Sequence, residues 1–262
     1  MGHHKISFAG DPHALDGAWS PPTSRANFCE EDYSFTAYMA EFINTLTNFI
    51  YIYYGILHIR RTNSKDFMSI SLLLLGTCSL LFHATLLLPL ELSDELSMLA
   101  LGWSLLQGIL TVTLDKFSRR YKLTNVFLAL FFVSFSAFYV YSQHIIYHSV
   151  VFISILATIT LRTTYLLLFT NNFPKDKRSE WTSKAWKTVA ILLLAFTVWD
   201  IDLGFCAELR ALRHAMGLPR AWLFELHGWW HILTGVSAAW FMDIVREMQE
   251  EIAKGKKKTK SK

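Results

Sequence analysis

Apolar residues along this chain collect in long blocks that are separated by short charged stretches. Seven blocks approach the length of about 20 mostly apolar residues that a helix needs to cross a bilayer. They cover residues 38–58, 67–88, 96–114, 123–142, 145–169, 186–205 and 222–245. The first block is the weakest, because it carries Glu41, Asn44 and Asn48. The pattern predicts an all-α membrane protein, a bundle of seven transmembrane helices.

The blocks divide the chain into three parts. Residues 1–37 form a polar N-terminal segment that lacks the apolar core of a cleavable signal peptide. Residues 38–245 form the helical domain, and residues 246–262 form a basic tail. Charged residues make up 18% of the 262 residues, against about 25% in ordinary soluble proteins, which argues against a soluble bundle of buried helices.

Lysine and arginine residues gather on one side of the predicted membrane. Three alternate loops and the tail carry 19 of them, whereas the opposite side carries 5. The positive-inside rule then places the tail in the cytosol and the N-terminus in the lumen or outside. Lys260 and Lys258, third and fifth from the C-terminus, resemble a dilysine retrieval signal. This predicts the endoplasmic reticulum membrane, or the Golgi; the alternative is a basic tail that touches anionic lipid.

Three histidines are unusual because ionisable groups inside a membrane are costly. His227 and His231 are four residues apart, so on a helix they share one face and can bind one Zn²⁺. His83 lies near the lumenal end of the second block, and the predicted orientation brings all three to a similar depth. Taken singly, each could instead be a buried histidine bonded to the backbone.

Three histidines with one open position are typical of a catalytic zinc, which lowers the pKa of its bound water to about 7. Asp94, at the predicted start of the third helix, could accept the water's proton, and Ser79 could donate to the developing oxyanion. Glu95 is a rival base, and Asp94 could instead be a charge that the helix dipole favours. The pattern predicts metal-assisted hydrolysis of an acyl bond in a lipid.

These residues resemble those of the alkaline ceramidases, which are related to the adiponectin-receptor-like membrane hydrolases. The similarity rests on Ser79, His83, Asp94 and the segments FCEEDY at 28–33, AEFINT at 40–45, WDID at 199–202 and HGWWHILTG at 227–235. It extends over about residues 18–245. The resemblance implies that the protein cleaves ceramide, including dihydroceramide or phytoceramide, to a sphingoid base and a fatty acid. It implies Zn²⁺ on the three histidines, with Ser79 and Asp94 as catalytic partners.

The resemblance also implies a Ca²⁺ site in the lumenal N-terminal segment, at Asn27, Phe28, Glu30, Asp32 and Glu41. Three carboxylates and an amide are the hard oxygen ligands that Ca²⁺ takes. The family has Asp at position 27, Trp at 28 and Asn at 32, so this chain exchanges the acid and the amide while keeping the total charge. The alternative is a solvated acidic cap on the first helix.

The resemblance further implies a disulfide between Cys29 and Cys206. Both cysteines are lumenal by the charge argument, whereas Cys78 lies inside the second block. An oxidising lumen permits a disulfide, although two free thiols are the alternative. Asp200 and Asp202, near the end of the sixth block, are expected to be structural.

Two other functions compete with the amidase. An adiponectin-receptor-type receptor would use the same site for signalling, but the predicted orientation is the inverse of theirs. A non-catalytic channel or lipid carrier could hold a structural metal, but Ser79 and Asp94 beside the histidines argue against it. We expect ceramide from the bilayer as the substrate, no nucleic-acid partner and no obligate protein partner.

Overall fold

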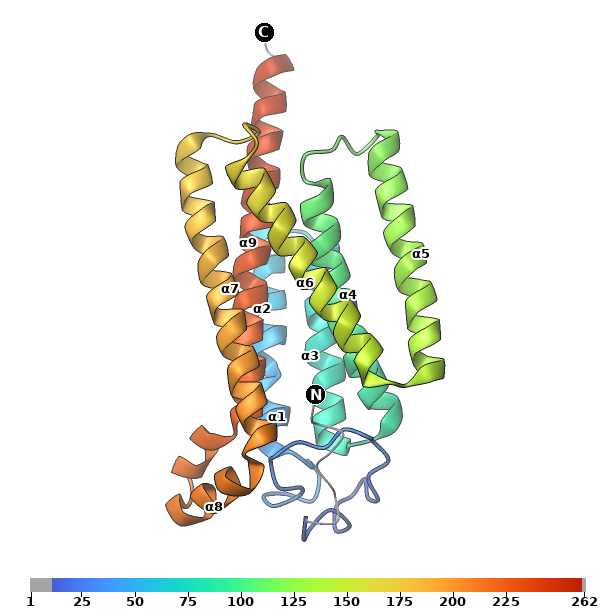
Figure 1. Ribbon diagram of the computed structural model, residues 1–262, viewed down its shortest axis with the longest axis vertical. Coiled ribbons are helices and arrows are strands. Elements are labelled where there is room, and N and C mark those ends of the chain that lie inside the picture. Colours follow the sequence, from blue (N-terminus) through green and yellow to red (C-terminus); the bar gives the residue numbers. More distant parts are fainter. Residues whose placement is uncertain (1–10, 261–262) are drawn as a thin grey trace.

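The computed structural model describes residues 11–260, with side chains described as far as residue 255, and it is built from helices. Figure 1 shows long helices side by side, with the N-terminal segment and α8 at one end and the C-terminal part of α9 at the other. The helices are α1 (Phe42–Thr47), α2 (Phe49–Thr62), α3 (Phe67–Thr85), α4 (Leu88–Thr111), α5 (Arg119–Ser142), α6 (Ile145–Leu168), α7 (Lys175–Gly204), α8 (Cys206–Met216), a 3-10 turn η3 (Arg220–Phe224) and α9 (Leu226–Lys260).

Helices occupy all seven predicted blocks, so the all-α class is confirmed. Within residues 11–260, α3, α5 and α6 are long and apolar enough to cross a membrane by length and composition alone. A fourth candidate is α7 together with α8, which are bent by 88° relative to one another. The remaining blocks are short, or carry acidic residues, so seven crossings and their orientation stay predictions. Lys5 and the side chains of Lys258 and Lys260 lie outside the described part.

Three element boundaries differ from the sequence prediction. Helix α4 begins at Leu88, with Pro89 in its first turn, so Asp94 lies well inside the helix rather than at its start. The first block is broken at Asn48 into α1 and α2, and α7 begins earlier than expected, at Lys175. Helix α8 was not predicted, because the apolar pattern ends where α7 bends into it.

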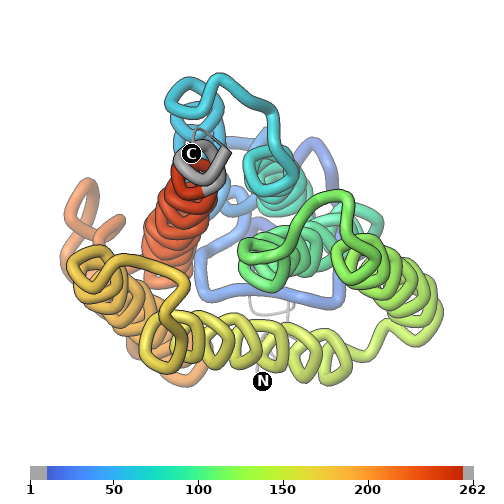
Figure 2. Tube along the Cα trace, turned by 90° about the horizontal axis from the view of Figure 1, so that it is seen from above, coloured from blue at the N-terminus to red at the C-terminus, as the bar shows by residue number. Residues whose placement is uncertain are grey.

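The helices that carry the site pack closely against α2. A Cβ atom added to Gly76 of α3 would lie 2.8 Å from Ile52 Cγ1, and one added to Gly235 of α9 would lie 2.8 Å from Ile50 Cγ2. Glycine therefore permits two helix backbones to approach α2 where a larger residue would clash. The view along the bundle shows α3 and α9 on either side of α2, with α4, α6 and α7 completing a ring (Figure 2).

The outward faces of the bundle are strongly apolar. Val133 of α5, Leu161 of α6 and Leu193 of α7 are each more than 60% exposed. Exposed apolar surface on this scale is unusual in a soluble protein and matches a helix surface in contact with lipid. In contrast, the buried core of the bundle lies along α3, α4 and α9, with Leu72, Ile109 and Met242 fully covered.

Candidate active site

The structure gathers the three predicted histidines into one cluster. His83 comes from the last turns of α3, and His227 and His231 come from the first turns of α9. Their ring centroids are 4.6 to 5.1 Å apart, and all three side chains are buried. Each ring offers one nitrogen, and these nitrogens lie within 4.8 Å of one another. This donor set fits a metal ion such as Zn²⁺, which takes imidazole ligands at about 2.0–2.1 Å.

Neighbouring side chains fix the orientation of two of these rings. His231 Nδ1 lies 2.9 Å from the hydroxyl of Thr47, and His83 Nδ1 forms a hydrogen bond with the carboxylate of Glu41. Each contact leaves the Nε2 atom to face the centre of the cluster. The ring of Phe28 lies on His227 with the centroids 3.9 Å apart. Such partners of ligand histidines set the tautomer and orient the ring before the metal binds.

Ser79 and Asp94 lie beside the histidines, as predicted. Ser79 is one turn before His83 on α3, and its hydroxyl lies close enough to the carboxyl of Asp94 on α4 to interact with it. Both residues are buried and line the same cavity as His227 and His231. The rival Glu95 is held differently, since its Oε2 accepts a hydrogen bond of 2.7 Å from the hydroxyl of Tyr139. The geometry therefore pairs Asp94, rather than Glu95, with Ser79.

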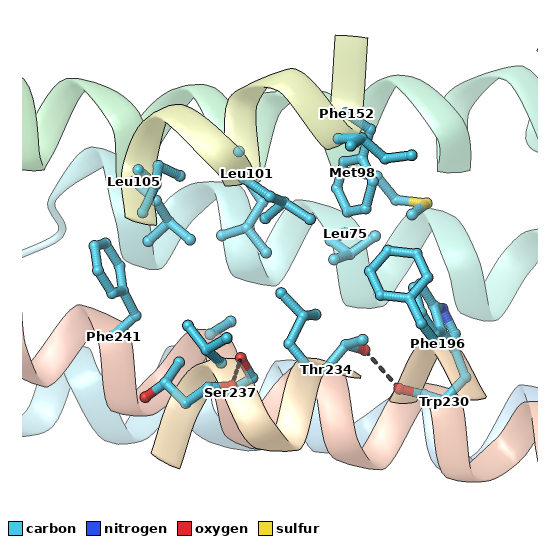
Figure 3. A pocket seen from close by; sticks show the side chains of 18 of the residues that line it. Leu75, Met98, Leu101, Leu105, Phe152, Phe196, Trp230, Thr234, Ser237 and Phe241 are labelled. Carbon is cyan, nitrogen blue, oxygen red and sulfur yellow. Dashed lines mark hydrogen bonds between the residues drawn. The ribbon is translucent and has the colours of Figure 1, made fainter. Parts of the chain in front are cut away.

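The polar cluster stands at one end of an apolar cavity of about 230 Å³. Figure 3 shows side chains from several helices around this cavity. Those labelled are Leu75, Met98, Leu101, Leu105, Phe152, Phe196, Trp230, Thr234, Ser237 and Phe241. A wall of this composition accommodates hydrocarbon chains and offers few hydrogen bonds. The arrangement can therefore hold a lipid whose polar group reaches Ser79, Asp94 and the histidines.

The N-terminal segment brings the expected calcium ligands into one buried region. Glu30 accepts hydrogen bonds from the backbone N–H groups of Ile43, at 2.6 Å, and Asn44, at 2.8 Å, and so caps α1. Both carboxylate oxygens of Asp32, the side chain of Asn27 and Glu41 Oε1 have no hydrogen-bond partner within the described chain. The sequence alone did not show that Glu41 also contacts a histidine.

Acidic side chains in this segment are buried close to one another, and this raises their pKa values. Burial, together with the nearby charge of Glu41, raises the pKa of Glu30 to about 8. Burial likewise raises the pKa of Asp32 to about 8, with additional contributions from Glu41 and Asp11. Both carboxyl groups therefore favour the protonated form unless a cation lies beside them.

Two residues of this region were missed by the sequence analysis. Asp11 accepts hydrogen bonds from the backbone N–H of Asp32, at 2.9 Å, and from Arg210, at 3.2 Å. Thr47 of α1 contacts Nδ1 of His231 through its hydroxyl. Neither residue carries a signal in the sequence, because each acts through a partner that is distant along the chain.

A disulfide joins Cys29 to Cys206, with the two Cα atoms 5.3 Å apart. It ties the N-terminal segment to the first residue of α8, while Cys78 is a free thiol. The backbone carbonyl of Cys29 also accepts a hydrogen bond of 2.6 Å from Arg213. Asp200 is exposed, whereas Asp202 is buried with its carboxyl beside the backbone of Cys29, Leu226 and His227, at the start of α9.

The fold and the site define a class of protein: a helical membrane protein with a buried histidine group, suited to holding a metal, beside an apolar cavity.

Comparisons with known proteins narrow this class. The sequence model of the ceramidase family matches residues 20–262. The chain is 31% identical over 228 residues to alkaline ceramidase 3 of Mus musculus, covering 85% of this chain and 82% of that protein. It is 30% identical over 251 residues to alkaline ceramidase YPC1 of Saccharomyces cerevisiae, covering 87% and 78%. It is 26% identical over 198 residues to an alkaline ceramidase of Arabidopsis thaliana, covering 73% and 74%. The chain belongs to the ceramidase family and is a multi-pass membrane protein.

Proposed function

We propose that this protein hydrolyses the amide bond of ceramide, releasing a sphingoid base and a free fatty acid. The observation that carries the proposal is the cluster of His83, His227 and His231 beside Ser79 and Asp94, at the polar end of an apolar cavity. The names of the similar proteins support the substrate class. Relative to the receptor and carrier alternatives, a buried acid–hydroxyl pair beside the histidines favours catalysis.

The three histidines would hold Zn²⁺ through the nitrogens that face one another. Zinc held there would supply Lewis acidity for the scissile carbonyl and would lower the pKa of water. Thr47 and Glu41 keep the rings of His231 and His83 in the ligating orientation. The pre-set rings reduce the entropy that must be lost when the ion binds.

Asp94 and Ser79 divide the remaining work. Asp94 is buried, and its Oδ1 lacks a hydrogen-bond partner among the described residues, so it can accept a proton from the attacking water and return it to the leaving amine. Ser79, one turn from His83, can turn its hydroxyl towards the oxygen of the tetrahedral intermediate. The apolar cavity holds the alkyl chains and excludes competing water.

The experiment that tests this function uses the full-length protein in detergent micelles with ceramide as substrate. Release of sphingoid base is measured with and without a zinc chelator. His231→Ala is expected to abolish turnover, whereas His144→Ala, at an exposed position before α6, keeps it. Turnover that survives both chelation and His231→Ala would remove the metal from the mechanism. An inactive wild-type protein would favour the receptor or the carrier.

We also propose that the N-terminal segment binds Ca²⁺ through Asn27, Phe28, Glu30, Asp32 and Glu41. The buried oxygens without protein partners support this, because Ca²⁺ takes six to eight oxygen ligands. Calcium is expected to raise the midpoint of thermal unfolding of the wild-type protein but not of Asp32→Ala. A shift of equal size in Asp32→Ala would contradict the site. Asp16→Ala, at an exposed position in the same segment, is the matched control.

The proposed topology has seven crossings over residues 38–245, a lumenal segment at 1–37 and a cytosolic tail at 246–262. The alternation of basic loops supports it, as does the position of the N-terminal segment at the end opposite the tail (Figure 1). Residence in the endoplasmic reticulum would follow from Lys258 and Lys260. Replacing both with serine is expected to release the protein from that compartment, which fluorescence microscopy would detect.

A further inference from the structure

Glu95 is an acid that the proposed mechanism does not use, although it lies in the same cavity. It follows Asp94 on α4, it is 8% exposed, and it lines the cavity together with His148 of α6. Adjacent residues on a helix point about 100° apart, so Glu95 presents its carboxyl to a different part of the cavity from Asp94. Its neighbours there are α5 and α6 rather than the histidine cluster.

The two oxygens of this carboxyl have different surroundings. Tyr139 donates its hydroxyl proton to Glu95 Oε2 at 2.7 Å. Tyr139 is 1% exposed and is not among the residues that line the cavity, so it holds the carboxyl from behind. Glu95 Oε1 is buried and has no hydrogen-bond partner among the described residues.

The backbone at Glu95 is fixed as well. The ring of His148 donates from Nε2 to the backbone carbonyl of Glu95 at 3.0 Å. Together with the Tyr139 contact, this hydrogen bond connects α4 to both α5 and α6 at Glu95. Such a group is preorganised, since little side-chain freedom remains to be lost when a ligand binds to it.

A buried acceptor without a donor is unfavourable, so a ligand of this cavity should supply one. The alkyl chains of a lipid amide have no donor. A sphingoid base has a hydroxyl on each carbon that flanks the amide-bearing carbon, and these hydroxyls enter the cavity at its polar end with the scissile bond. Apart from the N–H of the scissile amide itself, they are the donors that the ligand makes available to Glu95 Oε1.

We propose that Glu95 accepts a hydrogen bond from a hydroxyl of the sphingoid base and so determines the specificity of the site for hydroxylated lipid amides. The inference rests on the proposed function and adds a residue to it. Asp94 and Ser79 act on the reacting bond, whereas Glu95 binds the hydroxyl beside it. A site built to bond a hydroxyl disfavours the analogue that lacks it, because its own polar group is then left unpaired.

The test compares substrates that differ by one hydroxyl. The full-length protein in detergent micelles is given ceramide, 1-deoxyceramide and 3-deoxyceramide, and kcat/KM is measured for each. For the wild-type protein, at least one deoxy substrate is expected to have a kcat/KM roughly 5- to 150-fold lower, the range for loss of one such hydrogen bond. The selectivity ratio is kcat/KM for ceramide divided by kcat/KM for that deoxy substrate. Glu95→Leu removes the acceptor and is expected to bring this ratio to about 1 or below.

Two further variants keep the test decisive. Glu95→Gln keeps the shape of the side chain, and its amide oxygen can still accept the hydrogen bond from Tyr139. Its NH₂ group then faces the cavity in place of the acceptor, so the selectivity ratio is expected to fall while the protein stays folded. Met98→Leu alters an apolar residue of the same cavity wall, one turn along α4, and is expected to change kcat/KM for all three substrates by the same factor. The metal content of each variant reports that the histidine cluster is intact.

The outcomes separate this inference from the function on which it rests. A wild-type protein that hydrolyses none of the substrates refutes the proposed function, and the role of Glu95 with it. A wild-type protein that hydrolyses ceramide, with Glu95→Leu and Glu95→Gln keeping the wild-type ratio, refutes the role of Glu95 alone. Equal loss on all substrates in both variants also refutes it, because a purely structural role does not distinguish substrates by a hydroxyl.

Discussion

The contact between Thr47 and His231 yields the sharpest test of how the cluster is held. The Thr47 hydroxyl lies 2.9 Å from the backbone carbonyl of Ile43 and 2.9 Å from His231 Nδ1. A hydroxyl has one proton, which Thr47 donates to the carbonyl, so it can only accept from the imidazole. His231 must then carry its proton on Nδ1 and present the lone pair of Nε2 to the cluster.

Replacing Thr47 with valine keeps the shape and removes that acceptor. The buried Nδ1–H of His231 then loses its side-chain acceptor and keeps only the backbone of Asn44, which costs about 0.5–1.5 kcal/mol, and the other tautomer becomes more accessible. The ring can also rotate away from His83 and His227. At about 1.4 kcal/mol for each factor of ten, this cost corresponds to a loss of metal affinity of about 2- to 10-fold, which meets the lower end of the 10- to 100-fold range for loss of such a partner.

The measurement is competition between the protein and a zinc chelator of known affinity, followed by elemental mass spectrometry of the retained metal. Thr77→Val is the matched control, because the hydroxyl of Thr77 is exposed and donates at 2.9 Å to Leu73 within its own helix. Thr77→Val is expected to bind zinc like the wild type. Equal zinc affinity for Thr47→Val and the wild type would refute the reasoning about the tautomer.

Three other predictions concern stability. Thermal denaturation is expected to show that Gly76→Ala lowers the free energy of unfolding by about 1–3 kcal/mol, because its Cβ would lie 2.8 Å from a side-chain carbon of α2. Gly204→Ala is the control and should be close to neutral, because a Cβ there would have nothing within 4 Å. Cys29→Ser is expected to lower the free energy of unfolding by up to about 5 kcal/mol, since the disulfide closes a loop with a sequence separation of 177. An unfolding midpoint equal to that of the wild type, with or without reductant, would count against this. Glu91→Ala is expected to speed hydrogen exchange at residues 25–26, whose backbone N–H groups bond its carboxylate at 2.7 and 3.0 Å; unchanged protection there would contradict the expectation.

Helix positions followed from the sequence because burial in lipid demands long apolar runs. The spacing of His227 and His231 also survived in the structure, since i and i+4 positions share a helix face wherever the helix packs. His83 could be added only by assuming an orientation in the membrane. The sequence therefore predicted that these three histidines come together, provided that the helices run in the expected directions.

Contacts between distant segments could not be predicted in this way. The break at Asn48, the helix α8 and the start of α4 at Leu88 depend on tertiary packing rather than on hydropathy. The same is true of Tyr139 beside Glu95, because no pattern in either helix specifies the other. Polar residues that tune the site were thus hidden, although the groups they tune were visible.

The division of the histidine cluster between α3 and the final helix has a consequence for biosynthesis. Ribosomes deliver α3 early and α9 last, so no nascent chain holds all three histidines of the cluster until α9 has docked against α2. Binding of a metal ion at this cluster would then be a late step in maturation. A protein truncated before α9 would lack two of the three histidines and would be inactive, so incomplete chains would not hydrolyse lipids of the surrounding membrane.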